Sequence, residues 1–191
     1  MTKHIILASA SPRRKELLDQ IKVIYEVYPV DIDETPKPNE NPLDYVQRVA
    51  AEKSATCVAQ LNPSVPVLAA DTSVILNGVI MGKPKDQRDA LAMLMQLSGK
   101  THQVYTALSL RGREHSQVVS KTDVTFRTLT EQEILTYWQT GEPLDKAGSY
   151  AIQGLGGVFV ESIKGSFSGV VGLPLFETAQ LLSKQGIELF R

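Results

Sequence analysis

The sequence predicts a mixed α/β fold, in which helices flank a central sheet of parallel and antiparallel strands. Short apolar segments typical of strands alternate with amphipathic segments typical of helices, and several successive strand segments are separated only by turn residues. The chain has 191 residues, of which 42% are hydrophobic and 21% are charged. This size and composition fit one globular domain, or two lobes that share one core.

The first third of the chain alternates between strand and helix patterns. Residues 5–8 are apolar and typical of a strand. Ser11 is a favoured N-cap and Pro12 a favoured first residue, so a helix is expected to begin there. Residues 23–30 form a second strand pattern, and the proline-rich residues 33–42 predict a loop.

The middle of the chain carries the strongest turn signal. A helix is predicted for residues 42–61 and a strand for residues 65–76, which ends at the hairpin dipeptide Asn77-Gly78. Asp86 begins a further helix that Gly99 ends. The strands that follow are expected at residues 104–110 and 118–126.

The last third of the chain predicts a helix, a hairpin and a final helix. Thr130 and Glu133 form a capping box for the first of these helices. Residues 157–163 and 167–171 are predicted to pair as another hairpin. A last helix is expected over residues 174–186.

The overall charge and hydropathy disfavour two classes of partner. The chain carries 20 Lys+Arg against 21 Asp+Glu, a net charge of −1, whereas proteins that hold long nucleic acids are usually basic. No segment approaches the roughly 18 uninterrupted apolar residues of a membrane span, and the N-terminal apolar run is too short for a signal peptide. We therefore expect a cytoplasmic protein with neither partner. Cys57 is the single cysteine, so an intrachain disulfide is excluded.

Two arginines occupy an unfavourable place at the start of the first predicted helix. Arg13 and Arg14 lie in its first turn, where cations oppose the helix dipole. A bound anion would reverse this effect, because backbone N–H groups and guanidinium groups would contact it together. The alternative is a solvated first turn whose side chains reach water.

Two further charged residues interrupt apolar patterns. Lys53 lies within the apolar stripe of the 42–61 helix, so it must reach water, pair, or face a polar cleft. Asp71 lies at the centre of an apolar strand, where a structural ion pair is the simple explanation and a catalytic base or metal ligand the favoured one. Asp33 and Glu34 could add a second carboxylate to a divalent-cation site.

The polar residues 145–154 would suit recognition of a nucleotide base. Gln153 can both donate and accept hydrogen bonds, although an ordinary connecting loop is the simpler explanation. The sequence contains no P-loop, no G-x-G-x-x-G, no G-x-S-x-G and no H-E-x-x-H motif.

Seven short motifs, taken in order, resemble the Maf family of nucleoside triphosphate pyrophosphatases, from about residue 5 to the final helix. The motifs are Ser9-x-Ser11-Pro12-Arg13-Arg14, Asp33-Glu34-Thr35, Glu52-Lys53, Ala70-Asp71-Thr72, Gly82-Lys83-Pro84, Asp145-Lys146-Ala147-Gly148 and Val171-Gly172-Leu173-Pro174.

The resemblance implies a fold, a reaction and a cofactor. The fold would be inosine-triphosphatase-like, with residues 1–191 forming one domain of two lobes around a cleft. The reaction would convert a nucleoside triphosphate to the monophosphate and diphosphate, with Mg²⁺ or Mn²⁺. The family's catalytic aspartate matches Asp71, which would act as base or hold the metal together with Glu34. Its phosphate-binding residues match Ser9, Arg13, Arg14, Lys53 and Lys83.

The resemblance also implies a substrate class. The dTTP/UTP branch of the family matches this chain at the specificity residues Arg13, Thr72 and Gln153, whereas the branch acting on 7-methyl-GTP has tryptophan and glutamine at the first two positions. Ala69 is a small departure, because relatives often have glycine there. Modified pyrimidine nucleotides remain alternative substrates of the same chemistry. A nucleotide-binding regulator of cell division and septation, with little catalysis, is the rival function. A homodimer is compatible with the family.

Overall fold

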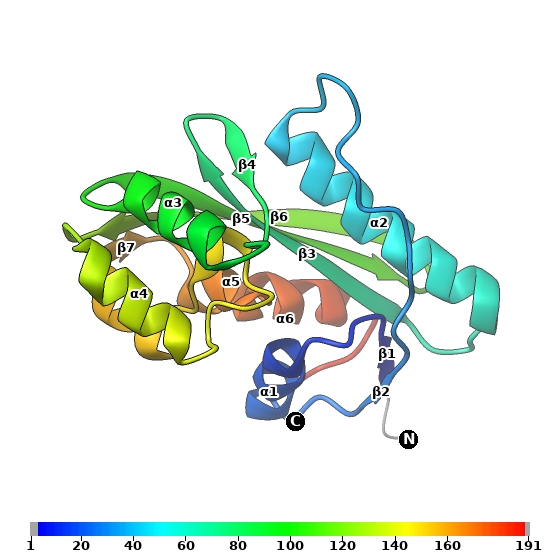
Figure 1. The fold of residues 1–191 in the computed structure, drawn as a ribbon. Coiled ribbons are helices and arrows are strands. Elements are labelled where there is room, and N and C mark those ends of the chain that lie inside the picture. Colours follow the sequence, from blue (N-terminus) through cyan, green and yellow to red (C-terminus); the bar gives the residue numbers. More distant parts are fainter. Residues whose placement is uncertain (1–3, 190–191) are drawn as a thin grey trace.

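Helices cover both faces of one mixed sheet in the computed structural model, which describes residues 4–189 (Figure 1). The described strands lie in the order β2-β1-β3-β5-β6-β7, with β4 also paired to β3. β1 pairs in parallel with β2 and β3, and the other pairings in this sheet are antiparallel. The predicted mixed α/β sheet is therefore confirmed. The strands are β1 (Ile5–Leu7), β2 (Tyr25–Val27), β3 (Val67–Leu76), β4 (Val79–Met81), β5 (Thr101–Arg111), β6 (His115–Phe126) and β7 (Val160–Lys164).

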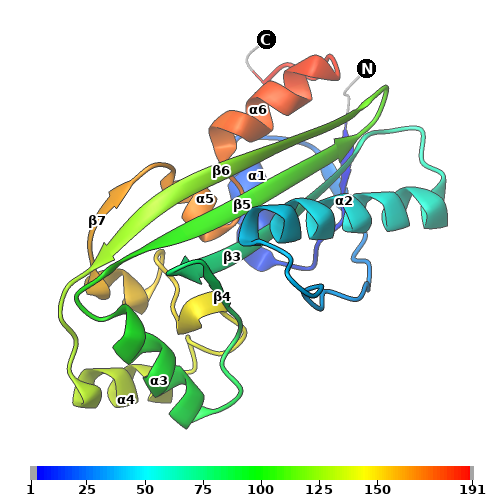
Figure 2. The same cartoon turned by 90° about the horizontal axis from the view of Figure 1, so that it is seen from above.

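The helices form a layer on each side of the sheet and a group at one end of it. Helix α2 packs along β3 and β5, whereas α5 and α6 pack against β6 on the other face; α3 and α4 pack together near one end of the long strands (Figure 2). None of the described helices is long and apolar enough to span a membrane. The helices are α1 (Pro12–Gln20), α2 (Pro42–Leu61), α3 (Gln87–Leu97), α4 (Glu131–Gln139), α5 (Phe167–Val171) and α6 (Leu175–Lys184), with 3₁₀ segments η1 (Ala147–Ser149) and η2 (Leu155–Phe159).

Strand β3 is buried on both faces, which explains its nearly continuous apolar sequence. Successive side chains of a strand point to opposite faces. Accordingly, Ala70 belongs to the largest core cluster, whereas Ala69 packs in the cluster that contains Cys57 of α2. The next two residues, Asp71 and Thr72, therefore point to opposite faces of the sheet.

The predicted turn at Asn77-Gly78 and the predicted caps of α3 and α4 are confirmed. Asn77 and Gly78 have φ values of 52° and 78°, as the tight hairpin between β3 and β4 requires. The side chain of Asp86 caps α3, and Thr130 and Glu133 make both hydrogen bonds of a capping box at α4.

The hairpin predicted for residues 157–163 and 167–171 is wrong. Residues Phe167–Val171 form helix α5, because Ser166 Oγ accepts the N–H of Gly169 at 2.9 Å and so caps a helical turn. β7 begins only at Val160, after a 3₁₀ segment, and pairs with β6.

Candidate active site

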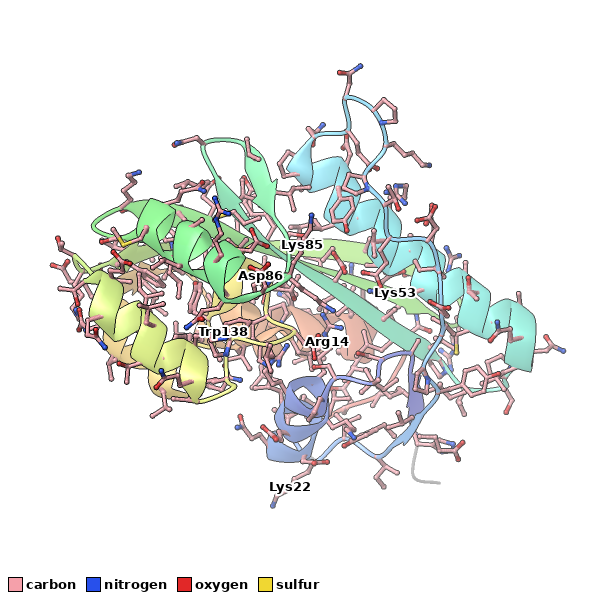
Figure 3. The ribbon with its side chains drawn as sticks, viewed as in Figure 1. Arg14, Lys22, Lys53, Lys85, Asp86 and Trp138 are labelled. Atoms are coloured by element: carbon pink, nitrogen blue, oxygen red, sulfur yellow. The ribbon has the colours of Figure 1, made fainter. Side chains whose placement is uncertain are left out.

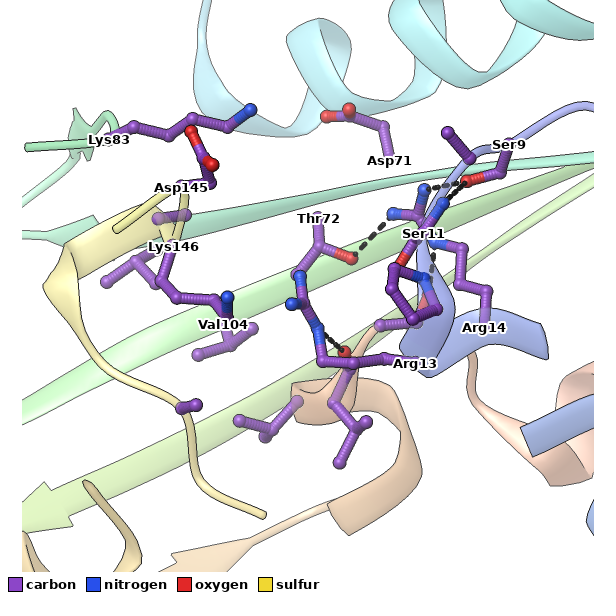
Figure 4. A pocket seen from close by; sticks show the side chains of 18 of the residues that line it. Ser9, Ser11, Arg13, Arg14, Asp71, Thr72, Lys83, Val104, Asp145 and Lys146 are labelled. Atoms are coloured by element: carbon purple, nitrogen blue, oxygen red, sulfur yellow. Dashed lines mark hydrogen bonds between the residues drawn. The ribbon is translucent and has the colours of Figure 1, made fainter. Parts of the chain in front are cut away.

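A cavity of about 610 Å³ opens where β3 has a free edge. On that edge β1 pairs with Val67 and Leu68 and β4 pairs from Val74 onward, which leaves residues 69–73 without a partner strand. The side chains in this cleft come from segments that are far apart in the sequence (Figure 4). Every residue of the expected site lines it, namely Ser9, Arg13, Arg14, Glu34, Lys53, Asp71, Thr72, Lys83 and Gln153.

Lys53 reaches from α2 toward β3 (Figure 3). Its ammonium group joins two carboxylates that line the cleft. Its Nζ lies 3.1 Å from Oδ1 of Asp71 and 2.9 Å from Oε1 of Glu34. Lys53 thus forms ion pairs instead of extending into water, and the buried Asp71 has the partner that a carboxylate needs. Asp33 does not line the cleft; its Oδ1 accepts the N–H of Thr35 at 2.9 Å and stabilises the loop.

Tyr45 fixes the loop that carries Glu34. Tyr45 lies near the start of α2 and is buried in a cluster that includes Ala107 of β5, and its hydroxyl donates to the backbone carbonyl of Glu34 at 2.9 Å. Burial raises the pKa of Tyr45 to about 12, and the negative charges of Asp71 and Glu34 add to that shift. The phenol therefore remains a hydrogen-bond donor at neutral pH.

On the opposite face of β3, Arg14 joins three segments of the cleft. Its guanidinium donates to Oγ1 of Thr72 at 3.3 Å, to Oγ of Ser9 at 3.0 Å and to the carbonyl of Gly172 at 2.9 Å. Burial lowers the pKa of Arg14, and the charge of Asp71 opposes this shift. Arg14 therefore organises the cleft in addition to carrying charge into it.

The first turn of α1 lines the cleft and contains no acidic residue. Ser11 is the N-cap residue, as predicted, but its hydroxyl makes no capping bond; its N–H donates to Ser9 Oγ at 3.3 Å. Arg13 donates from Nε to the carbonyl of Val171 at 3.4 Å, and burial lowers its pKa. Within residues 4–189, no carboxylate lies within ion-pair distance of Arg13 or Arg14. This positive charge, which no ion pair in the described residues neutralises, is suited to an anion.

Lysines from two more segments extend the positive side of the cleft. Lys83 follows β4, and Lys146 lies in a loop tied to it by the hydrogen bond from Gly148 N–H to the Gly82 carbonyl, 3.0 Å. Burial lowers the pKa of Lys146, and the charges of Arg13 and Lys83 lower it further. In Figure 4 the ends of the Arg13 and Lys146 side chains face each other. Lys146 belongs to one of the seven motifs, but no site role was expected for it, because a lysine in a polar loop resembles an ordinary solvated residue.

Gln153 lies at the exposed rim of the cleft, beside the buried side chain of Ile152. Its amide makes no hydrogen bond to another residue in the described range, so it is free to contact a ligand. Glu142 holds the segment that follows, because its carboxylate accepts the N–H groups of Leu155 and Gly156, each at 2.8 Å.

The expected metal ligands are close together, but they do not form a preassembled metal site. Asp71 and Glu34 converge on Lys53. In the part of the chain that the structure describes, no group of three or more His, Cys, Asp or Glu side chains is placed to hold a metal ion.

Comparisons with known proteins match nearly the whole chain. A family model described as Maf-like protein matches residues 4–185. A dTTP/UTP pyrophosphatase of Myxococcus xanthus is 52% identical over 97% of this chain and 94% of that protein, and a dTTP/UTP pyrophosphatase of Escherichia coli is 54% identical over 94% and 91%. The structure of a HAM1 protein from Coxiella burnetii covers 95% of this chain and 99% of that chain, with 13% identity and a TM-score of 0.56. This last similarity confirms the expected fold class.

Proposed function

The chain belongs to the family of Maf-like proteins, and from that premise we propose that it is a nucleoside triphosphate pyrophosphatase that hydrolyses dTTP and UTP. Relatives with 52% and 54% identity bear that activity in their names. The observation that carries the proposal is that one cleft has two sides: one holds carboxylates paired with Lys53, and the other holds cationic side chains that form no ion pair in the described residues. A nucleoside triphosphate needs both, for hydrolysis and for charge neutralisation. The cleft would separate two lobes of a single domain.

The cationic side chains are the proposed triphosphate site. Arg13, Arg14 and Lys83 have no carboxylate partner in the described residues, so binding phosphate oxygens would relieve their mutual repulsion. Guanidinium groups can contact two phosphate oxygens at once. Lys53 and the hydroxyl of Ser9 would add donors on either side. Charge that develops on the phosphates during reaction would be stabilised in place.

Asp71 is the proposed catalytic base. It would take a proton from a water molecule as the water oxygen attacks the α-phosphorus. The bond from the α-phosphorus to the bridging oxygen breaks, and diphosphate leaves with the electron pair. Lys53, 3.1 Å from Asp71 Oδ1, would orient the carboxylate during the transfer.

Asp71 and Glu34 are the proposed metal ligands. Mg²⁺ commonly binds through one or two carboxylates together with substrate phosphate oxygens, rather than in an all-protein site. Two converging carboxylates, with no third ligand among the described residues, fit that kind of shared site. When bound, Mg²⁺ or Mn²⁺ would neutralise phosphate charge and lower the pKa of a bound water.

Thr72, Gln153 and Arg13 are the proposed base-recognition residues. They share a cleft wall with Val74 and Val104, which offer an apolar surface for a flat pyrimidine ring. Neutral and cationic hydrogen-bonding groups suit uracil and thymine, whose edges present carbonyl acceptors and one N–H donor.

A substrate panel tests the proposal. The protein is incubated with dTTP, UTP, CTP, ITP and 7-methyl-GTP, with Mg²⁺ or Mn²⁺, and diphosphate release is measured. We expect kcat/KM for dTTP and UTP to exceed the other values by about tenfold or more. Nucleotide binding without diphosphate release would support the regulatory alternative instead. Equal turnover of 7-methyl-GTP or CTP would refute the pyrimidine assignment.

A further inference from the structure

Thr72 is backed by a second threonine from the neighbouring strand. Thr106 of β5 lies directly opposite Thr72 in the register of the two strands and is fully buried. The two Oγ1 atoms are 2.9 Å apart. Thr72 is the only partly exposed residue of β3, and it lines the cleft together with Asp71 and Val74 of the same strand.

The hydrogen bonds of this pair leave no freedom in the position of the protons. A hydroxyl has one proton to donate and two lone pairs that accept. Thr106 donates its proton to the carbonyl of Gly169 at 2.7 Å, because a carbonyl can only accept. The proton between the two threonines must therefore come from Thr72. Arg14 donates into Thr72 Oγ1 at 3.3 Å and occupies one of its lone pairs.

Thr72 is consequently left with one lone pair and no proton for a ligand. In uracil and thymine, N3 carries a proton and can donate to such an acceptor. In cytosine, N3 has no proton and presents a lone pair of its own, which would face the lone pair of Thr72.

We propose that Thr106 is a positioning residue for base selection. It accepts the hydrogen bond that the Thr72 hydroxyl donates, and so makes Thr72 an obligate acceptor for the N3–H of uracil or thymine. This inference rests on the proposed function, in which Thr72 contacts the base. Thr106 acts through Thr72 and never touches the substrate.

Replacing the buried hydroxyl separates this role from packing. In Thr106→Val the shape of the side chain is kept, but the Thr72 hydroxyl no longer has Thr106 as its acceptor. Thr72 can then donate to N3 of cytosine as well as accept from N3–H of uracil. We expect kcat/KM for CTP to rise and the UTP-to-CTP ratio of kcat/KM to fall about tenfold, the effect of one hydrogen bond. Thr106→Ser keeps the hydroxyl and should retain the wild-type ratio.

Thr178→Val is a matched control. Thr178 is also fully buried and donates to a backbone carbonyl, that of Pro174, at 2.7 Å, but it lies outside the cleft. This control should lose stability without a change in the ratio. A folded Thr106→Val protein with the wild-type ratio would overturn the inference, and so would a Thr106→Ser protein that loses the ratio as Thr106→Val does.

A modified substrate tests the same hydrogen bond without any variant. N3-methyl-UTP lacks the proton that Thr72 would accept, so the wild-type protein should hydrolyse it at least about tenfold less efficiently than UTP. Turnover of N3-methyl-UTP equal to that of UTP would overturn the inference even if Thr106→Val failed to fold. A wild-type protein with no preference for UTP over CTP would instead refute the proposed function itself.

Discussion

Replacing Asp71 with Asn should abolish turnover while leaving the fold largely intact. The amide has the same size but cannot take a proton, and removal of a general base typically lowers a rate by 10² to 10⁴-fold. That loss corresponds to about 3 to 5 kcal/mol in the activation free energy. The free energy of unfolding should change less, because Lys53 keeps Glu34 as a partner at 2.9 Å when the charge of Asp71 is gone.

A second variant of the same ion pair shows why stability should be spared in Asp71→Asn. Lys53→Met would leave Asp71 buried without its cation, and breaking a buried pair in this way costs about 3 to 5 kcal/mol. Asp71→Asn leaves no uncompensated buried carboxylate, so we expect a loss of about 1 to 2 kcal/mol. For a chain of this size each kcal/mol lowers Tm by roughly 2 to 4 °C.

The two effects are measured separately. Diphosphate release from dTTP gives kcat for each variant, and thermal unfolding followed by circular dichroism gives Tm. We expect both variants to lose turnover and Lys53→Met to unfold at the lower temperature. A near-native rate for Asp71→Asn would refute its role as base. Equal Tm values for the two variants would refute the electrostatic reasoning.

The other predictions concern the loop beside the cleft and the response to acid. Lys146→Gln should raise KM for dTTP about tenfold, the effect of a lost charge-assisted hydrogen bond. Lys85 lies outside the cleft, so Lys85→Gln should leave KM unchanged. Equal increases in KM for the two variants would indicate a long-range electrostatic effect instead of direct contact. Gly148→Ala should lower stability by about 1 to 3 kcal/mol in thermal unfolding, because φ is 68° and a Cβ would lie 2.9 Å from Val74; an unchanged Tm would contradict this. Burial lowers the pKa of His102 from 6.5 to about 4 in the folded protein, so the unfolded chain binds this proton more readily, and stability should fall as pH drops from about 6.5 toward 4. Urea midpoints across that range should fall less in His102→Gln, and an equal fall would count against this assignment.

Most of the fold can be predicted from local sequence signals, such as turn and cap residues, that the structure also shows. Asn77-Gly78 and the capping box at Thr130 act within a few residues, so no distant contact is needed to interpret them. The segment Phe167–Val171 shows the opposite case. Its valines favour a strand, but a serine cap and the packing of α5 on β5 and β6 determine a helix.

The candidate site was predictable where a charge breaks an apolar pattern. Lys53 and Asp71 interrupt buried stripes, and the structure pairs them. Lys146 gives no such signal, because a charge in a polar loop breaks no pattern. Thr106 gives none either, since threonine is ordinary in a strand and its importance depends on the register between β3 and β5.

That register links the core to the chemistry of the cleft. Asp71 and Thr72 are adjacent in sequence, yet one meets Lys53 beneath α2 and the other meets Arg14 on the opposite face. A shift of β3 by one residue would exchange the two faces, so the carboxylate would enter the large core and the hydroxyl would face Lys53. Apolar burial on both faces and pairing with β5 from Val67 to Ile75 oppose such a shift. The packing of residues outside the cleft therefore decides which side of the free edge presents the proposed catalytic carboxylate and which presents the proposed base-recognition hydroxyl.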